Sequence, residues 1–150
     1  TDGNGIPCRE AFEWYKAAEG KGMAIWYKNT GEWWDKTSLK ANDGISLEEQ
    51  LNNESSLFNY YKKLIRLKQS NLALANGKYE NAWNNNSHVF SFYRTRNQRK
   101  VLVAVNLSDV KQISVFRDAY KKYIPLLGNN IVTKNTVVLN PYEVAVFKIK

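Results

Sequence analysis

The 150-residue sequence predicts an α+β fold in which helices come first and an antiparallel β-sandwich with Greek-key connections follows. Three observations support this order. The first 45 residues have no regular period, an amphipathic helical pattern runs over residues 55–69, and short strand patterns separated by turn residues fill residues 78–150. We therefore expect two structural regions, residues 1–76 and residues 77–150.

The first 45 residues contain many glycines but are rich in aromatic side chains, which favours an ordered loop on a larger body over disorder. The aromatic side chains of its central part are Trp26, Tyr27, Trp33 and Trp34. A short helix is expected near residues 9–18, because Phe12 and Tyr15 stand three positions apart. The chain begins without Met or a signal sequence, and we expect it to be the inside of a larger protein.

Two helical segments are predicted before the strands begin. Residues 46–49, Ser-Leu-Glu-Glu, form a capping box that predicts a short helical turn. The main helix follows at 55–69, and Asn76-Gly77 ends the helical region. Its apolar stripe contains Leu57, Tyr61, Leu64 and Ile65. Because this stripe needs a partner, we expect it to pack against residues 1–45 or against something outside this chain.

From residue 78 the period changes to two, and turn residues separate the segments. The predicted strands include residues 88–94, 100–106, 111–117, 136–139 and 143–149. The alternation and the apolar run at its centre predict burial of Phe90, Phe92, Val101, Val103, Val105, Val144 and Val146. Two such sheets cover each other, so this region is expected to form its own core.

The formal net charge of +8 raises the question of an anionic partner. The 22 Lys and Arg residues are spread along the chain, often beside acids. The short clusters among them are Arg94, Arg96, Arg99 and Lys100 in one hairpin, and Lys121 with Lys122. No nucleic-acid-binding motif accompanies them, so we expect no nucleic-acid partner.

Other classes of protein are disfavoured by the composition. No apolar run approaches the roughly 20 residues of a membrane span, so no membrane partner is expected. The single cysteine, Cys8, excludes an intramolecular disulfide and cannot support a metal site. The single histidine, His88, opens an alternating strand, which indicates a strand residue rather than a member of a catalytic triad.

Five segments resemble, in order and in spacing, segments of the α-amylase family of glycoside hydrolases. The segment IPCREAFEW at 6–14 resembles the family's IR(E/T)PM(Q/R)W, and SLEEQ at 46–50 resembles its (S/N)VEEQ. Residues 55–74 resemble the eighth barrel helix and its exit. VLVAVNLS at 101–108 and LNPYEVAVF at 139–147 resemble two strands of the trailing β domain. The sequence departs from the pattern at Ala11, Phe12 and Leu72, where the family usually has Pro, Met and Pro.

The resemblance implies that residues 1–76 hold the last loop and eighth helix of a (β/α)8 TIM barrel. Residues 77–150 would then be the β-sandwich called domain C. It also implies a retaining hydrolase of α-1,4-glucans such as starch and maltooligosaccharides. The family's catalytic carboxylates lie on earlier barrel strands, and their motifs do not occur in this sequence. We therefore expect no catalytic residue here, an inactive isolated chain, and the remainder of the same barrel as its partner.

The resemblance also points to residues that would contact the glucan. Arg9 and Trp14 match the family's Arg and Trp, and the loop they belong to follows the eighth barrel strand. The expected substrate-binding residues are Arg9, Trp14, Trp33 and Trp34. Arg9 would hold a sugar hydroxyl or orient a carboxylate, and the alternative is a salt bridge with Glu10 or Glu13. The tryptophans would stack on sugar rings, and the alternative is packing of the loop on the barrel.

No cofactor and no metal ligand are expected in this chain, and any calcium site is expected in the part of the enzyme outside it. We expect a secreted, extracellular enzyme rather than a cytoplasmic one. The alternative function is a stand-alone carbohydrate-binding sandwich, which would bind glucan through surface aromatics such as Tyr79, Trp83 and Tyr93. The amphipathic helix at 55–69 argues against this alternative, because the sandwich does not need that helix as a cover.

Overall fold

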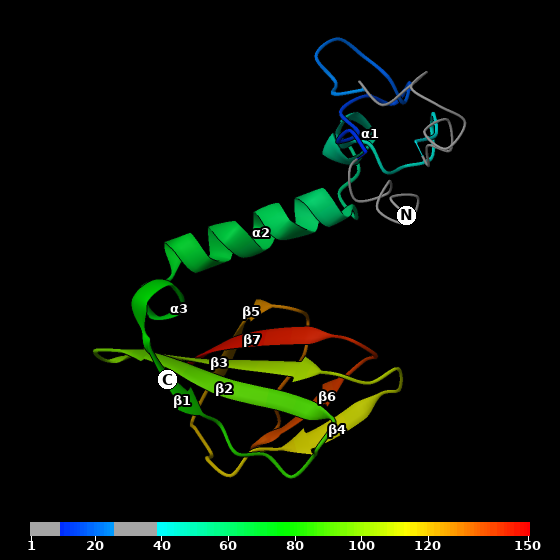
Figure 1. Cartoon of the computed structure of the whole chain (residues 1–150). Coiled ribbons are helices and arrows are strands. Elements are labelled where there is room, and N and C mark those ends of the chain that lie inside the picture. Colours follow the sequence, from blue (N-terminus) through cyan, green and yellow to red (C-terminus); the bar gives the residue numbers. More distant parts are fainter. Residues whose placement is uncertain (1–9, 26–38) are drawn as a thin grey trace, which may run out of the picture. The chain divides into compact units, whose positions relative to one another are not determined.

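The computed structural model describes residues 10–25 and 39–150 of the chain (Figure 1). The chain divides into two compact units, Thr1–Leu64 and Ile65–Lys150, and the division falls inside a helix. The helices are α1 (Leu47–Leu51), α2 (Leu57–Ser70) and α3 (Leu72–Asn76). The strands are β1 (Lys78–Asn81), β2 (Val89–Arg96), β3 (Arg99–Asn106), β4 (Gln112–Val115), β5 (Tyr123–Leu127), β6 (Thr136–Leu139) and β7 (Val144–Ile149).

The predicted capping box is confirmed at the start of α1. The Ser46 Oγ accepts a hydrogen bond from the Glu49 backbone N–H at 3.3 Å, and the Glu49 carboxylate accepts one from the Ser46 backbone N–H at 3.3 Å. The Ser46 hydroxyl also donates to this carboxylate at 2.6 Å. These bonds satisfy donors that the first turn of a helix leaves without an intrahelical partner.

The helix predicted near residues 9–18 is wrong for residues 10–18, which are irregular at 11–14 and make a turn at 16–17. Their backbone groups bond to a distant segment of the same unit instead. The Glu13 carbonyl accepts from the Leu47 N–H at 2.8 Å, and the Lys16 carbonyl accepts from the Asn42 N–H at 2.8 Å. Tertiary hydrogen bonds have therefore replaced the local bonds that a helix would need.

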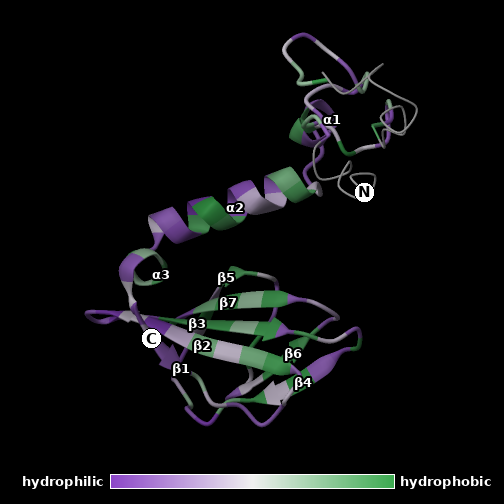
Figure 2. Cartoon of the chain, in the orientation of Figure 1, coloured by the Kyte–Doolittle hydropathy of each residue, from purple (hydrophilic) through white to green (hydrophobic). Residues whose placement is uncertain are grey.

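Helix α2 confirms the predicted main helix and ends one residue later than predicted. Asn71 interrupts the helix and caps α3, because its side-chain oxygen accepts from the N–H groups of Ala73 and Leu74. No residue of α2 is buried, and Leu57 and Ile65 are 66% and 53% exposed. In Figure 2 the ribbon of this helix alternates between green, where its residues are hydrophobic, and purple, where they are hydrophilic. The stripe is thus without a cover in the described part of the chain, and its burial against residues 1–45 or against something outside the chain stays a prediction.

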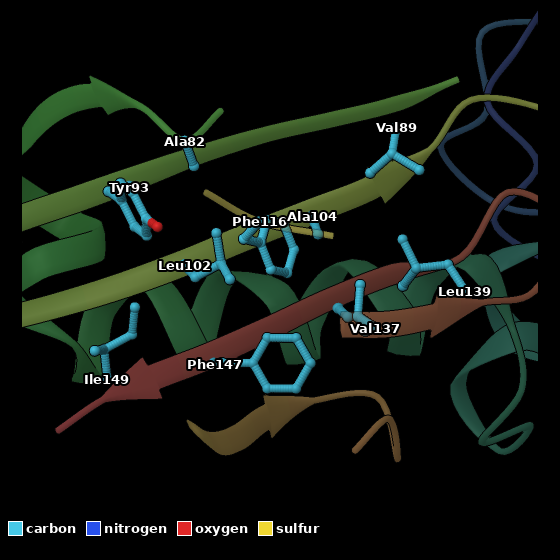
Figure 3. Close-up of a cluster of buried hydrophobic side chains, with 11 residues drawn as sticks. Ala82, Val89, Tyr93, Leu102, Ala104, Phe116, Val137, Leu139, Phe147 and Ile149 are labelled. Atoms are coloured by element: carbon cyan, nitrogen blue, oxygen red, sulfur yellow. The ribbon is translucent and has the colours of Figure 1, made fainter. Parts of the chain in front are cut away.

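The second unit is an antiparallel β-sandwich, as predicted. The larger sheet has the order β1-β2-β3-β7-β5, and β4 pairs with β6 in the smaller one. Eleven buried side chains form the core between the sheets, and Figure 3 shows ten of them labelled. Phe116, Val137 and Leu139 belong to the core and are fully buried, as are Leu102 and Phe147 of the larger sheet. Strand β5 is an edge strand that contains Pro125 and an irregularity between Pro125 and Leu127.

The face of the larger sheet turned away from the core also carries apolar residues. Phe92, Val103 and Val146 stand opposite one another across β2, β3 and β7. The seven residues predicted to be buried all lie on this outer face. Val101, Val103 and Val146 are buried as predicted, whereas Phe92, Val105 and Val144 are only half-buried. The prediction is wrong for Phe90, which is 47% exposed, because α3 covers only part of this face.

Candidate functional site

Of the four residues expected to bind substrate, Trp14 is the one that the structure describes; Arg9, Trp33 and Trp34 lie outside the described residues. The Trp14 side chain is 49% exposed. Its ring lies 4.5 Å from the Phe12 ring between centroids, with the planes tilted by 54°. Two neighbouring aromatic rings are therefore available on the first unit, and their half-exposed faces suit contact with the C–H face of a sugar.

The backbone around Trp14 is fixed by the first turn of α1. The N–H groups of Leu47 and Glu48 point out of the start of the helix and have no intrahelical acceptor. They donate to the carbonyls of Glu13 and Trp14 at 2.8 and 3.1 Å. The Lys16 N–H donates to the Glu48 carboxylate at 2.9 Å. The capping box stabilises the first turn of α1, and that turn in turn fixes the backbone around Trp14.

A hollow of about 430 Å³ lies beside this segment. Its apolar lining includes Phe12, Leu39 and Ile45, and its polar lining includes Glu13 and Gln50. The Gln50 side chain is already engaged, since its nitrogen donates to the Ile45 carbonyl and its oxygen accepts from the Phe58 N–H. The hollow thus combines an aromatic rim with a carboxyl group that has capacity for further hydrogen bonds.

That carboxyl group, Glu13, was considered from the sequence only as a salt-bridge partner. Partial burial, and then the negative charge of Asp43, raises the pKa of the Glu13 carboxyl above its ordinary value of 4.5. The Lys40 backbone N–H bonds to this group and works in the opposite direction. Its Oε2 atom is buried and has no hydrogen-bond partner within residues 10–25 and 39–150. Sequence reasoning missed this environment because Lys40 and Asp43 are far from Glu13 in the chain.

The three surface aromatics of the alternative function have different environments in the sandwich. Tyr93 is buried at 2% exposure and belongs to the core, so its predicted exposure is wrong. Tyr79 is exposed, and its ring stacks on Phe92 at 5.4 Å. Trp83 is 48% exposed, and the Arg117 guanidinium lies 4.9 Å from its ring centroid. Of the three aromatics, Tyr79 and Trp83 are therefore exposed enough to contact a glucan on the sandwich surface.

Metal-binding side chains do not gather in the described part of the chain. Within residues 10–25 and 39–150, no group of three or more His, Cys, Asp or Glu side chains is arranged to hold a metal ion. His88 is exposed, and its backbone N–H donates to the Asn86 side chain at 2.9 Å. Cys8 lies outside the described residues. Among the helices of the same ranges, none has the length and apolar character needed to span a membrane.

The chain was compared with known protein families, sequences and structures. No protein-family model matches the sequence. The chain is 32% identical over 126 residues to an oligo-1,6-glucosidase of Bacillus cereus, which covers 81% of this chain and 22% of that protein. It is 28% identical over 142 residues to alpha-amylase 3 of Dictyoglomus thermophilum, covering 94% of this chain and 27% of that protein. The crystal structure of an α-amylase from H. orenii superposes with a TM-score of 0.68 at 24% identity, covering 93% and 28% of the two chains.

The chain thus spans about a fifth to a quarter of the length of the curated relatives it matches. The 126-residue match is longer than either compact unit, so the similarity includes parts of both. A likeness confined to the sandwich would indicate a shared β domain alone. Because it extends through the helical segment as well, the chain belongs to the α-amylase family of glycoside hydrolases.

Proposed function

We propose that this chain supplies the last loop and helix of a (β/α)8 barrel, together with domain C, to a retaining hydrolase of α-glucans. The observation that carries this proposal is the similarity to an oligo-1,6-glucosidase and an α-amylase across both units. The uncovered apolar stripe of α2 supports it, since a barrel helix packs its apolar stripe against neighbouring elements. The remainder of the barrel is then the partner of this chain.

Hydrolysis with retention needs two carboxyl groups about 5–5.5 Å apart, one as nucleophile and one as acid and base. We assign no catalytic residue to this chain and propose that both carboxylates come from other parts of the barrel. Within this scheme the loop from Thr1 to Trp34 borders the substrate cleft. Arg9 would donate hydrogen bonds to a sugar hydroxyl or a catalytic carboxylate, and Trp14, Trp33 and Trp34 would stack on sugar rings.

The bond that is cleaved is proposed to be α-1,4, as the resemblance of the sequence implies. A second candidate is the α-1,6 bond, because the relative from Bacillus cereus is named as an oligo-1,6-glucosidase. Turnover of maltotriose and of isomaltose by the enzyme that contains this chain distinguishes the two. An enzyme for α-1,4 bonds cleaves maltotriose to glucose and maltose and leaves isomaltose intact.

Arg9→Ala in the enzyme that contains this chain tests the placement of the loop. We expect kcat/KM for the cleaved oligosaccharide to fall by about tenfold or more, since a charged hydrogen bond contributes about 1.5–3 kcal/mol. Trp33→Ala and Trp34→Ala should chiefly raise KM, because stacking stabilises ground and transition states alike.

Trp83→Ala, which removes an aromatic of the sandwich, is the matched control and should leave both constants unchanged. Wild-type kinetics in the loop variants, at unchanged melting temperature, would place the loop away from the cleft. Turnover by the isolated chain would contradict the absence of catalytic residues. We also propose a secreted enzyme in which any calcium site lies outside this chain.

A further inference from the structure

The charge of the protein is distributed very unevenly between the two units. Residues 65–150 contain fourteen Lys and Arg against four Asp and Glu, a net charge of +10. Residues 1–64 contain eight Lys and Arg against ten Asp and Glu, a net charge of −2. The net positive charge of the chain therefore resides in the sandwich unit, and a net charge of this size favours anionic partners.

The fold brings the two basic clusters of the sequence to one end of the larger sheet. The register places Lys100 opposite Ile149, and Tyr123 opposite the same Ile149. The hairpin between β2 and β3 and the segment before β5 therefore meet at the end of β7. In Figure 2 the ends of β1 and β2 near the C-terminus are hydrophilic.

Several of these cations share the outer face of the sheet. Arg94, Val101 and Lys148 form one row of register partners, and the alternation of strand residues puts Arg96 and Arg99 on the same face. The backbone groups of Lys122 and Lys150 bond to each other in both directions, at 3.2 and 3.0 Å, and so extend the pairing of β5 with β7. We call this set the basic end: Arg94, Arg96, Arg99, Lys122, Lys148 and Lys150.

Like charges stand directly opposite each other at the basic end. Arg96 is the register partner of Arg99, and Lys122 is bonded across to Lys150. Such opposed pairs are destabilising. Glu80 does not relieve them, because it lies 3.6 Å from Lys100, whose ammonium faces the core side over the Tyr93 ring. Within residues 65–150, no carboxylate side chain forms an ion pair with the basic end, and the ion pair of this unit joins Lys100 to Glu80.

Two hollows adjoin the basic end, and Arg99 lines both. One of about 410 Å³ is bounded by Leu72 and the turn from Arg96 to Arg99. The other, of about 360 Å³, has Lys148 and Asn71 on its polar side. The Asn71 oxygen is fixed by capping α3, which leaves its NH₂ group free to donate. Arg99, Lys148 and Asn71 thus line one hollow, and each of these side chains carries N–H donors.

The second hollow also has an apolar side, formed by Leu67, Val101 and Leu126. A volume of this size lies within the range of small-ligand sites. An apolar wall next to a cluster of cations suits a sugar ring that carries a charged substituent. Near the hollow, the Nε atom of Arg94 is buried and has no hydrogen-bond partner in the described part of the chain. Arg94 stands two strands from Lys148, about 10 Å across the sheet.

We propose that the basic end binds a glycan chain that carries sulfate or phosphate groups, with one charged group held by Arg99 and Lys148. The cations extend across β2, β3, β7 and β5, about 14 Å at the usual spacing of strands. One small ion reaches only two of them, whereas a chain with repeated anionic groups contacts several at once and offsets their repulsion. The binding does not depend on the proposed hydrolase activity, because none of these residues belongs to the loop assigned to the cleft.

The test is binding of the 150-residue chain to fluorescein-labelled short dextran sulfate, measured by fluorescence anisotropy at about 0.1 M NaCl. Neutral dextran has the same glucan backbone without the charges and should not bind. Arg99→Gln combined with Lys148→Gln should weaken binding of dextran sulfate by at least about tenfold, because two charge-assisted contacts are lost. Binding should also weaken strongly as NaCl rises towards about 1 M.

The matched control combines Lys111→Gln with Lys134→Gln, two exposed lysines of the same unit outside the basic end. It changes the net charge by the same amount and should weaken binding by no more than about twofold. Equal losses in the two double variants would show a diffuse attraction and overturn the site. Tighter binding to a DNA duplex of similar charge than to dextran sulfate would contradict the proposal that the ligand is a glycan. Displacement of dextran sulfate by an equal concentration of inorganic phosphate would contradict the proposal that the site binds a polymer through several charged groups.

A far-ultraviolet circular dichroism spectrum and a melting temperature like those of the unaltered chain are required of both double variants. If Arg99→Gln with Lys148→Gln fails to fold, the single variants Arg99→Lys and Arg99→Gln replace it. Arg99→Lys keeps the charge and loses the planar donor pair, so it should retain more binding than Arg99→Gln. Equal binding by these two variants would overturn the role of Arg99.

Discussion

The two units of this chain are stabilised in different ways. The sandwich unit encloses a continuous core of eleven buried side chains, and its strands pair over most of their length. In the described part of the other unit, the buried apolar cluster consists of Ala11 and Met23, with Ile25 and Leu39 packed against it. There, hydrogen bonds from the first turn of α1 to Glu13 and Trp14 hold the backbone in place. The sandwich unit therefore has a core of its own, whereas the described part of the first unit buries few apolar side chains.

The largest expected effect comes from removing a core side chain of the sandwich. Phe147→Ala should lower the free energy of unfolding by about 3–5 kcal/mol, because Phe147 is fully buried between the two sheets. Urea unfolding followed by circular dichroism measures the change. The same substitution at Phe12, which is 62% exposed in the other unit, should stay within about 0.5 kcal/mol. Similar losses at both positions would show that the two units do not differ in this way.

A middle-sized effect is expected from the capping box of α1. Ser46→Ala removes the oxygen that accepts from the Glu49 N–H and should cost about 0.5–2 kcal/mol of local stability. Hydrogen exchange should then accelerate at the amides of Leu47 and Glu48, which bond to the Trp14 segment. Ser55→Ala is the control, since Ser55 is exposed. Unchanged exchange in the Ser46 variant would mean that the segment is held without α1.

The smallest effect concerns two carboxyl groups of the first unit whose pKa values move in opposite directions. The pKa of Glu13 is raised by burial, so its folded form holds the proton more tightly than the unfolded form. Its ionisation therefore reduces stability as the pH rises from below 4.5 through its folded pKa. Glu13→Gln removes this loss, and the variant should be more stable than the unaltered chain at pH 7, within about 0.5 kcal/mol. The gain should vanish near pH 4, roughly the pKa of an unfolded Glu.

Glu49 supplies the opposite case. The Ser46 hydroxyl donates to its carboxylate and lowers its pKa, so the stability it contributes is present above 4.5 and is lost as the pH falls through the folded pKa. Glu49→Gln should therefore lower the melting temperature at pH 7 and change it less at low pH. Thermal unfolding of both variants between about pH 3 and 7 tests the pair. Shifts of the same sign at pH 7 would contradict these directions.

Local sequence signals predicted much of this fold. The capping box, the main helix and the strands at 112–115, 136–139 and 144–149 appear close to where the patterns indicated. These elements depend on contacts near in sequence or on a clear alternation, which a single sequence displays. The non-helical structure of residues 10–18 could not be seen in the same way, because it depends on hydrogen bonds to residues some 26–34 positions away.

The buried face of β2 was also predicted wrongly from the sequence. Phe90 and Phe92 were expected inside because Ser91 between them is polar, yet Ser91 is buried at 3% exposure. Its hydroxyl donates to the Ala82 carbonyl at 2.6 Å and accepts from the Asn84 side chain at 2.8 Å. A polar side chain with its bonds made inside the fold is tolerated in the core. Those partners come from the loop before β2, and no local period reveals them.

The site was predicted only in part for a related reason. Trp14 was identified from a motif, and the structure places it on a supported, half-exposed segment. Glu13, its neighbour, was not singled out, because its raised pKa depends on burial and on Asp43. A motif reports which residues accompany a function, whereas an electrostatic environment depends on the completed fold.

Strand β5 has a consequence for the behaviour of the protein in concentrated solution. It forms one edge of the larger sheet, and its Pro125 has no backbone N–H to offer to another strand. The irregularity that follows breaks the straight row of backbone groups that an incoming strand would need. The opposite edge, β1, is only four residues long and begins with Lys78. Both borders of the sheet therefore discourage the strand-by-strand growth that leads to amyloid-like aggregates.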